Sequence, residues 1–137
     1  MNLVSVRIIT ANMVNMVKFY EKITGIQATQ YTPDFAELQT PTATIAIGST
    51  KTLLLFGGEG IAEPAENRTA IIEFLVKDVV KEFERLRDFL SSSVVQEPTT
   101  MPWGNTSLLF RDPDGNLVNF FTPVTKESIE KFMSVMQ

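Results

Sequence analysis

The sequence contains an internal repeat with an offset of 66 residues, and this feature constrains the fold more than any other. Asn12 and Asp78 each stand directly before a helical pattern of apolar residues, where either side chain can cap a helix. Sequence identity between the two copies is low, but cap, strand and helical face keep the same register. The chain therefore predicts two copies of a strand–helix–strands module. The offset aligns these apolar pairs: Ile8 with Phe74, Val17 with Phe83, Tyr20 with Leu86, and Ile23 with Phe89.

Alternation and turn residues predict the elements of the first copy. Asn12 begins a helix with apolar positions at helical spacing, and Gly25 ends it. The predicted strands are Leu3–Thr10, Gln27–Tyr31, Phe35–Gln39, Thr44–Ile47 and Thr52–Phe56.

The second copy begins with a strand over Thr69–Val76 and a helix capped by Asp78. The helix carries Val79, Val80, Phe83, Leu86, Phe89 and Leu90 on one face, and Ser91–Ser93 closes it. A strand candidate follows at Val94–Glu97. Thr106–Phe110 and Leu117–Thr122 then flank Asp112-Pro113-Asp114-Gly115-Asn116, which predicts an antiparallel hairpin with an ordinary turn.

The segments outside the two copies have separate roles. We expect a single domain over residues 1–137, with modules at 1–60 and 68–124, a connector at 61–67 and a C-terminal helix at 125–137. The stretch Gly57–Asn67 is glycine-rich but lacks the Lys-Ser/Thr of a phosphate loop. In the last segment Ile129, Phe132, Met133 and Met136 follow an amphipathic spacing, which suits packing onto the domain, a dimer contact or a lid.

Composition excludes several classes of function. The formal net charge of −4 argues against a nucleic-acid binder, and no long apolar run predicts a membrane span. The absence of cysteine and of a secretory pattern at the start leads us to expect a cytoplasmic protein. The absence of histidine excludes imidazole-dependent zinc, nickel or iron sites and Ser-His nucleophiles, so only an oxygen-liganded hard cation remains conceivable.

Trp103–Phe121 also carries a family resemblance. Pro-Trp-Gly before a strand, then Phe-Arg-Asp-Pro-Asp-Gly-Asn-Leu and another strand, resembles the last two strands of the vicinal oxygen chelate superfamily. That superfamily includes glyoxalase I, bleomycin-resistance proteins, fosfomycin-resistance enzymes and extradiol dioxygenases. The resemblance implies an α+β fold in which two βαβββ modules form a curved mixed sheet around a cavity. It leaves function open, because one scaffold hosts many chemistries.

The resemblance also locates the positions that hold the metal in catalytic members. It places them at Ser5, Ile71 and Asn119, with a fourth inside Thr44–Phe56, where no carboxylate occurs. Serine, isoleucine and asparagine supply too little charge and too few ligands for a divalent cation. We therefore expect no metal and no other cofactor.

Alternation along the strands indicates which side chains face the cavity. This alternation predicts that five side chains face the cavity: Ser5, Arg7, Glu73, Asn119 and Phe121. Arg7 and Glu73 share the 66-residue offset and have two open interpretations, a mutually satisfied or solvated pair and two poles that hold a polar ligand. The candidate ligand-binding residues are Arg7, Trp103, Glu73, Asn119, Phe121, Ser5, Glu37 and Phe56, with Phe35, Tyr31 and Met101 as further possible wall residues.

Three functions remain open from the sequence. The first is a metal-free protein resembling bleomycin-resistance proteins that sequesters a planar or aromatic molecule in a cavity at a homodimer. The second is a glyoxalase-like lyase or isomerase with Glu37 or Glu73 as its base. The third is a dimeric scaffold whose own side chains fill the cavity.

Overall fold

The computed structural model describes residues 1–58 and 60–136. Glu59, in the predicted glycine-rich connector, and Gln137, at the end of the predicted C-terminal helix, lie outside the described residues. The chain divides into two compact units, Met1–Asn67 with Pro113–Gly115, and Arg68–Asp112 with Asn116–Gln137. Each unit is described by itself below.

The first unit contains one four-stranded mixed sheet in the order β1-β4-β3-β2, together with α1. The central strand β4 pairs parallel with β1 and antiparallel with β3, and β2 forms the outer edge beyond β3. The elements are β1 (Ser5–Thr10), α1 (Met13–Thr24), β2 (Thr29–Thr32), β3 (Phe35–Gln39), β4 (Thr44–Ser49) and the 3-10 helix η1 (Thr50–Phe56).

One face of the first sheet forms a core against α1. Asn12 caps α1 through its side chain, which accepts a hydrogen bond from the Asn15 N–H at 3.1 Å, and Gly25 ends it in the left-handed conformation. The helix buries Met16, Val17, Phe19, Tyr20 and Ile23. Strand alternation supplies the opposing buried side chains Ile8, Ala36, Leu38, Ile45 and Ile47.

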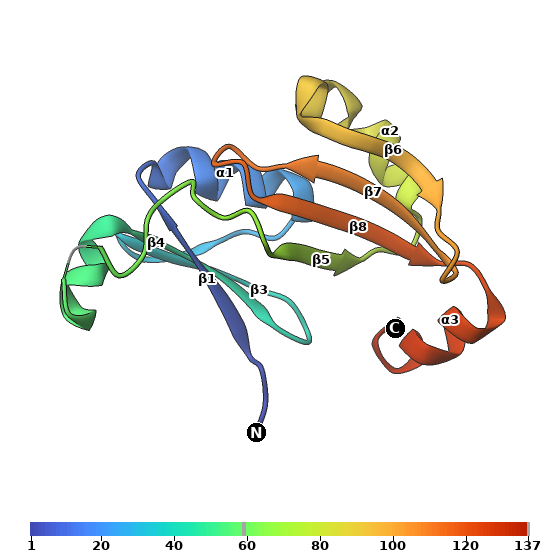
Figure 1. The fold of residues 1–137 in the computed structure, drawn as a ribbon, viewed down its shortest axis with the longest axis horizontal. Coiled ribbons are helices and arrows are strands. Elements are labelled where there is room, and N and C mark those ends of the chain that lie inside the picture. Colours follow the sequence, from blue (N-terminus) through green and yellow to red (C-terminus); the bar gives the residue numbers. More distant parts are fainter. Residues whose placement is uncertain (59, 137) are drawn as a thin grey trace. The chain divides into compact units, whose positions relative to one another are not determined.

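The second unit repeats this order with β5-β8-β7-β6 and α2. Strand β8 pairs parallel with β5 and antiparallel with β7, and Figure 1 shows α2 beside β6 and β7. Asp78 caps α2 by accepting from the Lys81 N–H at 3.1 Å. The elements are β5 (Ile71–Leu75), α2 (Val79–Leu90), the 3-10 helix η2 (Ser91–Ser93), β6 (Val94–Thr100), β7 (Asn105–Arg111), β8 (Leu117–Pro123), α3 (Lys126–Phe132) and the 3-10 helix η3 (Met133–Val135).

The predicted strand at Thr52–Phe56 is wrong, because this segment lies in η1. The Ser49 hydroxyl accepts from the Lys51 N–H at 3.2 Å, and the Thr52 hydroxyl donates to the Ser49 carbonyl at 2.7 Å. Such local hydrogen bonds between side chain and backbone favour a turn of helix over a strand. Gly57 then ends η1 in the left-handed conformation.

Two of the helical faces are narrower than predicted. In α2 the buried residues are Val79, Phe83, Leu86 and Leu90, whereas Val80 and Phe89 are exposed. The C-terminal helix α3 ends at Phe132 and is followed by η3, and Figure 1 shows it beyond the end of β8. Ile129, Met133 and Met136 of the predicted apolar face are exposed.

These observations confirm the predicted α+β fold with two βαβββ modules and a C-terminal helix. The strands form two four-stranded mixed sheets, and a cavity enclosed by them stays a prediction. Across the described residues, no helix combines the length and apolarity that crossing a membrane requires.

Candidate functional site

The first sheet has a second face, opposite the one that α1 covers, on which Arg7 meets two phenyl rings. Arg7 lies on β1 and pairs with Ala46, while Phe35 pairs with Gly48 on the same face. The Arg7 guanidinium carbon lies 4.8 Å from the centre of the Phe35 ring and 5.4 Å from that of Phe56. Both distances are within the range of cation–π attraction.

Gly48 allows η1 to approach β4 closely beside Arg7. A Cβ placed on Gly48 would lie 3.6 Å from Arg7 Cδ and only 3.0 Å from the Thr52 hydroxyl oxygen. The missing side chain therefore leaves room for η1 to lie close to β4, while the Arg7 stem would be in ordinary van der Waals contact with an added Cβ. In this way η1, which sequence analysis predicted as a strand, positions the Phe56 ring over the guanidinium.

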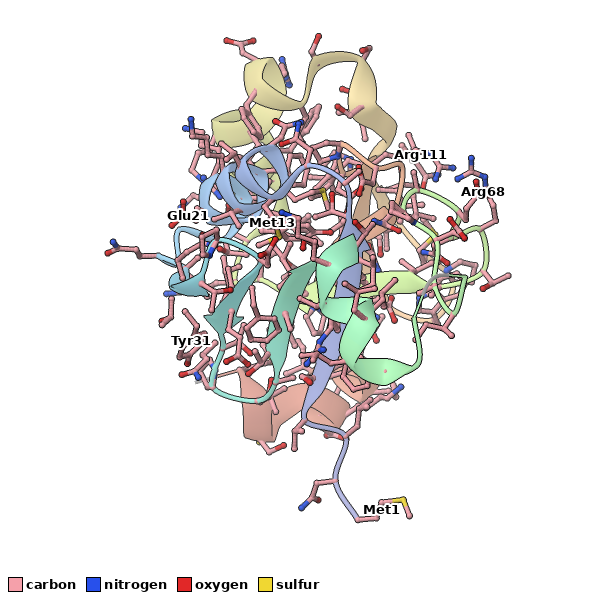
Figure 2. The ribbon with its side chains drawn as sticks, turned by 90° about the vertical axis from the view of Figure 1, so that its left-hand side faces the viewer. Met1, Met13, Glu21, Tyr31, Arg68 and Arg111 are labelled. Atoms are coloured by element: carbon pink, nitrogen blue, oxygen red, sulfur yellow. The ribbon has the colours of Figure 1, made fainter. Side chains whose placement is uncertain are left out.

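Tyr31 and Glu37 extend the same group of side chains towards the sheet edge. The Tyr31 ring centre lies 6.0 Å from that of Phe35, and Figure 2 shows Tyr31 at the outer edge of the first sheet. The negative charge of Glu37, with some desolvation and a hydrogen bond to the same carboxylate, raises the pKa of Tyr31 above its usual 10.0. In that hydrogen bond the Tyr31 hydroxyl donates to the Glu37 carboxylate.

We name Arg7, Tyr31, Phe35, Glu37 and Phe56 the first-sheet cluster. Much of its aromatic surface is open to solvent, since Tyr31 is 57% and Phe56 61% exposed. It presents flat rings beside one guanidinium and one carboxylate. Such a surface can stack a planar guest and hydrogen-bond to its polar groups.

The structure brings some of the predicted ligand-binding residues into this cluster. Arg7, Glu37 and Phe56 belong to it. Ser5 shares the face of Arg7 by strand alternation and is exposed at the start of β1.

Glu73 and Asn119 are adjacent on one face of the second sheet. They face each other across β5 and β8, and the Asn119 side-chain amide donates to the Glu73 carboxylate at 2.8 Å. Asn119 is buried, while Glu73 is exposed. Because Arg7 belongs to the first unit and Glu73 to the second, the predicted relation between these two charges stays a prediction.

Phe121 packs against a residue that sequence analysis did not select for the site. Its ring centre lies 5.1 Å from that of Phe132 on α3, so α3 docks through Phe132 onto this face of β8. The available signal was the amphipathic spacing of the last segment, which identified Phe132 as apolar but not its partner.

Trp103 lies in the turn between β6 and β7 and is 68% exposed. This turn is built by its neighbours: the Gly104 N–H donates to the Met101 carbonyl, and the Gly104 carbonyl accepts from the Val124 and Thr125 N–H groups. The Pro-Trp-Gly sequence thus joins the β6–β7 turn to the start of α3, and it leaves the indole free to contact other molecules.

The residues at the positions that the family resemblance assigns to a metal do not fit a divalent cation. Ser5 offers one hydroxyl and Ile71 only hydrocarbon, while the amide nitrogen of Asn119 is directed at Glu73. Across residues 1–58 and 60–136, no three acidic side chains gather in a group that suits a metal ion. Hard cations need more oxygen ligands and more negative charge than these positions supply.

Comparisons with known proteins extend these observations. The family model described as "Glyoxalase/Bleomycin resistance protein/Dioxygenase superfamily" matches residues 2–120. A search of curated proteins gave no match.

Solved structures share the fold. A glyoxalase/bleomycin resistance protein/dioxygenase from Nocardioides is 20% identical, with 92% of this chain and 85% of that chain covered and a TM-score of 0.75. A family enzyme of the same description from Burkholderia phytofirmans is 19% identical, with 90% and 100% covered and a TM-score of 0.78. A protein from the mobile metagenome of V. Pseudocholerae is 26% identical, with 89% and 94% covered and a TM-score of 0.64. Since the family model spans most of the chain and the two βαβββ modules agree with it, this chain belongs to the glyoxalase/bleomycin resistance protein/dioxygenase superfamily.

Proposed function

We propose that this protein binds and sequesters a small planar or aromatic molecule without a metal ion, and that the planar guest carries an anionic group. The observation that carries this proposal is the first-sheet cluster, in which a guanidinium lies over two phenyl rings beside a solvent-exposed tyrosine. The rings supply stacking surface, and the guanidinium supplies N–H donors for a carboxylate or a similar group.

The two charged side chains of the cluster, Glu37 and Arg7, differ in how readily they can bind a guest. Tyr31 hydrogen-bonds to Glu37, which leaves this carboxylate less able to bind the guest. Arg7 is exposed, and its ring contacts leave the edge of the guanidinium to donate hydrogen bonds. The cluster therefore favours a negatively charged planar guest over a positively charged one.

The proposal that no metal takes part rests on the chemistry of the donor set. Ser5, Ile71 and Asn119 stand where catalytic members hold their metal, and together they provide no carboxylate. Binding through stacking and hydrogen bonds needs no such ligand set.

We also propose that the protein acts as a homodimer. In support, η1 presents Leu54 and Leu55 to solvent beside Phe56, with 64% and 88% of each residue exposed. Such neighbouring apolar side chains are typical of surfaces that a partner covers. Sedimentation equilibrium should give about twice the chain mass of 15.3 kDa, and a single-chain mass at every concentration would contradict the dimer.

The binding proposal is tested by a thermal-shift titration with planar aromatic carboxylates such as 2-naphthoate and quinoline-2-carboxylate. Ligand at about 100 times its Kd should stabilise the fold by roughly 2.7 kcal/mol. Matched planar compounds with an alcohol or an amine in place of the carboxylate should bind more weakly.

Two variants make the titration specific. Arg7→Met keeps an unbranched apolar side chain but removes the guanidinium, and should weaken carboxylate binding roughly tenfold, about 1.4 kcal/mol. Lys18→Met removes an equal charge from an exposed position on α1 and should bind as the wild type does. Equal affinity in wild type and Arg7→Met, or no planar compound that raises Tm, would refute the proposal.

A further inference from the structure

The pair Glu73 and Asn119 forms a polar patch beside apolar side chains on one face of the second sheet. Asn119 pairs with Glu73 on one side and with Leu109 on the other. Leu117 and Phe121 share its face of β8 by strand alternation. Ser107 and Arg111 of β7 lie on the same face, opposite Phe121 and Leu117. Phe132 of α3 packs against the buried Phe121, so Leu109 and Leu117 are the apolar side chains next to the pair.

The hydrogen bond between the pair fixes the orientation of the Asn119 amide. Its nitrogen donates to Glu73 at 2.8 Å, and the flipped amide would place an oxygen against the carboxylate, acceptor against acceptor. The amide oxygen Oδ1 therefore points away from Glu73. Asn119 is only 7% exposed, and its Oδ1 is buried without a hydrogen-bond partner.

A buried acceptor without a donor is unusual in a folded protein and points to a group that supplies one. The carboxylate next to it selects the charge of that donor. Glu73 is exposed, and neither of the ion pairs Lys81–Asp78 and Arg85–Glu82 involves it. The Glu73 charge is thus available to a ligand.

The number of oxygen atoms that Glu73 and Asn119 can supply favours an organic cation over a metal ion at this site. One carboxylate and one amide oxygen fall well short of the six to eight oxygens typical of Ca²⁺. A protonated primary amine needs less, since its three N–H groups can be shared between a carboxylate, an amide oxygen and water.

We propose that Glu73 and Asn119 bind the ammonium group of a primary amine, with the apolar part of the amine on Leu109 and Leu117. The ammonium donates to the Glu73 carboxylate and to Asn119 Oδ1, and so satisfies the buried acceptor. This subsite lies wholly in the second unit, and it selects the opposite charge from the first-sheet cluster.

The experiment is a titration of ¹⁵N-labelled protein with 2-phenylethylamine, followed through the side-chain amide resonances of Asn119. Those resonances are assigned by their loss in Asn119→Leu. We expect saturable shifts of the Asn119 amide with the amine, and much smaller shifts with 2-phenylethanol or phenylacetate, which share the ring but not the positive charge.

Variants separate a binding role from a structural one. Glu73→Gln keeps an acceptor for the Asn119 amide but removes the charge, and should weaken amine binding roughly tenfold or more. Glu84→Gln, at an exposed position of α2, removes the same charge and should have no effect. Asn119→Leu should abolish amine binding while the fold keeps or gains thermal stability, because no unpaired buried acceptor remains.

Several results would overturn the proposal. They are equal shifts with amine and alcohol, an unchanged amine affinity in Glu73→Gln, and a Mn²⁺ or Ni²⁺ titration that saturates the same resonances more tightly than the amine. If Asn119→Leu does not fold, Glu73→Gln with its Glu84→Gln control decides the question. Arg7→Met with planar carboxylates tests the first-sheet proposal, and Glu73→Gln with the amine tests this one, so failure here and failure of the first-sheet proposal are distinguishable.

Discussion

Some single residues in this protein have roles that their residue type alone does not predict. Tyr31 is a surface tyrosine on an edge strand, yet the charge of the neighbouring Glu37 carboxylate raises its pKa. Gly104 lies in a turn, but its missing side chain lets the chain pass close to Thr125. Each of these roles leads to a measurable prediction.

Replacing Glu37 by glutamine should lower the pKa of Tyr31 towards its ordinary value of 10.0, because the largest cause of its increase is the Glu37 charge. A spectrophotometric titration of tyrosinate measures the change. Tyr31→Phe identifies the transition, since Tyr20, buried on α1, is the other tyrosine. An unchanged midpoint in Glu37→Gln would show that the carboxylate does not act on Tyr31.

The same pKa gives the sign of a pH dependence. Tyr31 binds its proton more tightly in the folded than in the unfolded chain, so its contribution to stability is complete below pH 10.0. It is lost as pH rises through the higher pKa of the folded state. Urea unfolding at increasing alkaline pH should show this loss in the wild type and a smaller one in Glu37→Gln.

Replacing Gly104 by alanine should destabilise the fold by about 2–5 kcal/mol, from backbone strain and overpacking together. Gly104 has a φ of +96°, and an added Cβ would lie 2.2 Å from the Thr125 hydroxyl oxygen. Gly25→Ala is the matched control, because its φ is +70° and nothing lies within 4 Å of the added atom. Urea unfolding should show a smaller loss there, about 1 kcal/mol, and equal losses would argue against the contact with Thr125.

Among the elements, the two helices that follow the first strand of each module show how far the internal repeat extends. Asn12 and Asp78 cap them in the same way, each by accepting from the N–H three residues later. The repeat also aligns their other ends, since Gly25 and Ser91 are both C-cap residues with positive φ. The second copy thus has a serine where the first has a glycine, the residue that a positive φ favours.

Ser91→Gly should therefore stabilise the protein by about 1 kcal/mol, because Ser91 has φ 48° and ψ −120°, a conformation that strains any residue with a Cβ. The reciprocal change, Gly25→Ser, should destabilise the protein by a similar amount. Urea unfolding measures both free energies. A loss of stability in Ser91→Gly would show that the serine makes a compensating interaction.

Sequence patterns predicted the elements well where local chemistry decides them. The turn from Asp112 to Asn116 follows its sequence closely, with the Asn116 backbone N–H donating to the Asp112 carboxylate at 2.9 Å. The prediction for Thr52–Phe56 failed because its β-branched and apolar composition suits a strand, while Ser49 and Thr52 form local hydrogen bonds that close a 3-10 turn. The prediction that Val80 and Phe89 lie on the buried face was wrong, because α2 is buried along a narrower stripe than its apolar residues cover.

For the molecule as a whole, the comparisons establish the superfamily. The chemistry has to be inferred from the residues of this chain, because one fold hosts many functions. The positions that would hold a metal carry a hydroxyl, a hydrocarbon side chain and an amide. We therefore expect metal removal to have no consequence.

Dialysis against a chelator should leave both Tm and the binding of planar carboxylates unchanged. Elemental analysis of protein purified without added metal should give far less than one ion per chain. Stoichiometric metal, or a fall in Tm that one divalent cation restores, would contradict the metal-free proposal.

The sequence by itself determined the two modules, their caps and turns, and the face on which each strand residue lies, because these depend on neighbours along the chain and on strand and helix periods. It also singled out Arg7, Glu37 and Phe56 as candidates. Only the tertiary structure decided that Arg7 lies over Phe35 and Phe56, that Tyr31 donates to Glu37, and that Asn119 donates to Glu73 and leaves its oxygen unpaired. Those contacts join residues on different strands and on η1, and their distances depend on strand register and on the space left at Gly48.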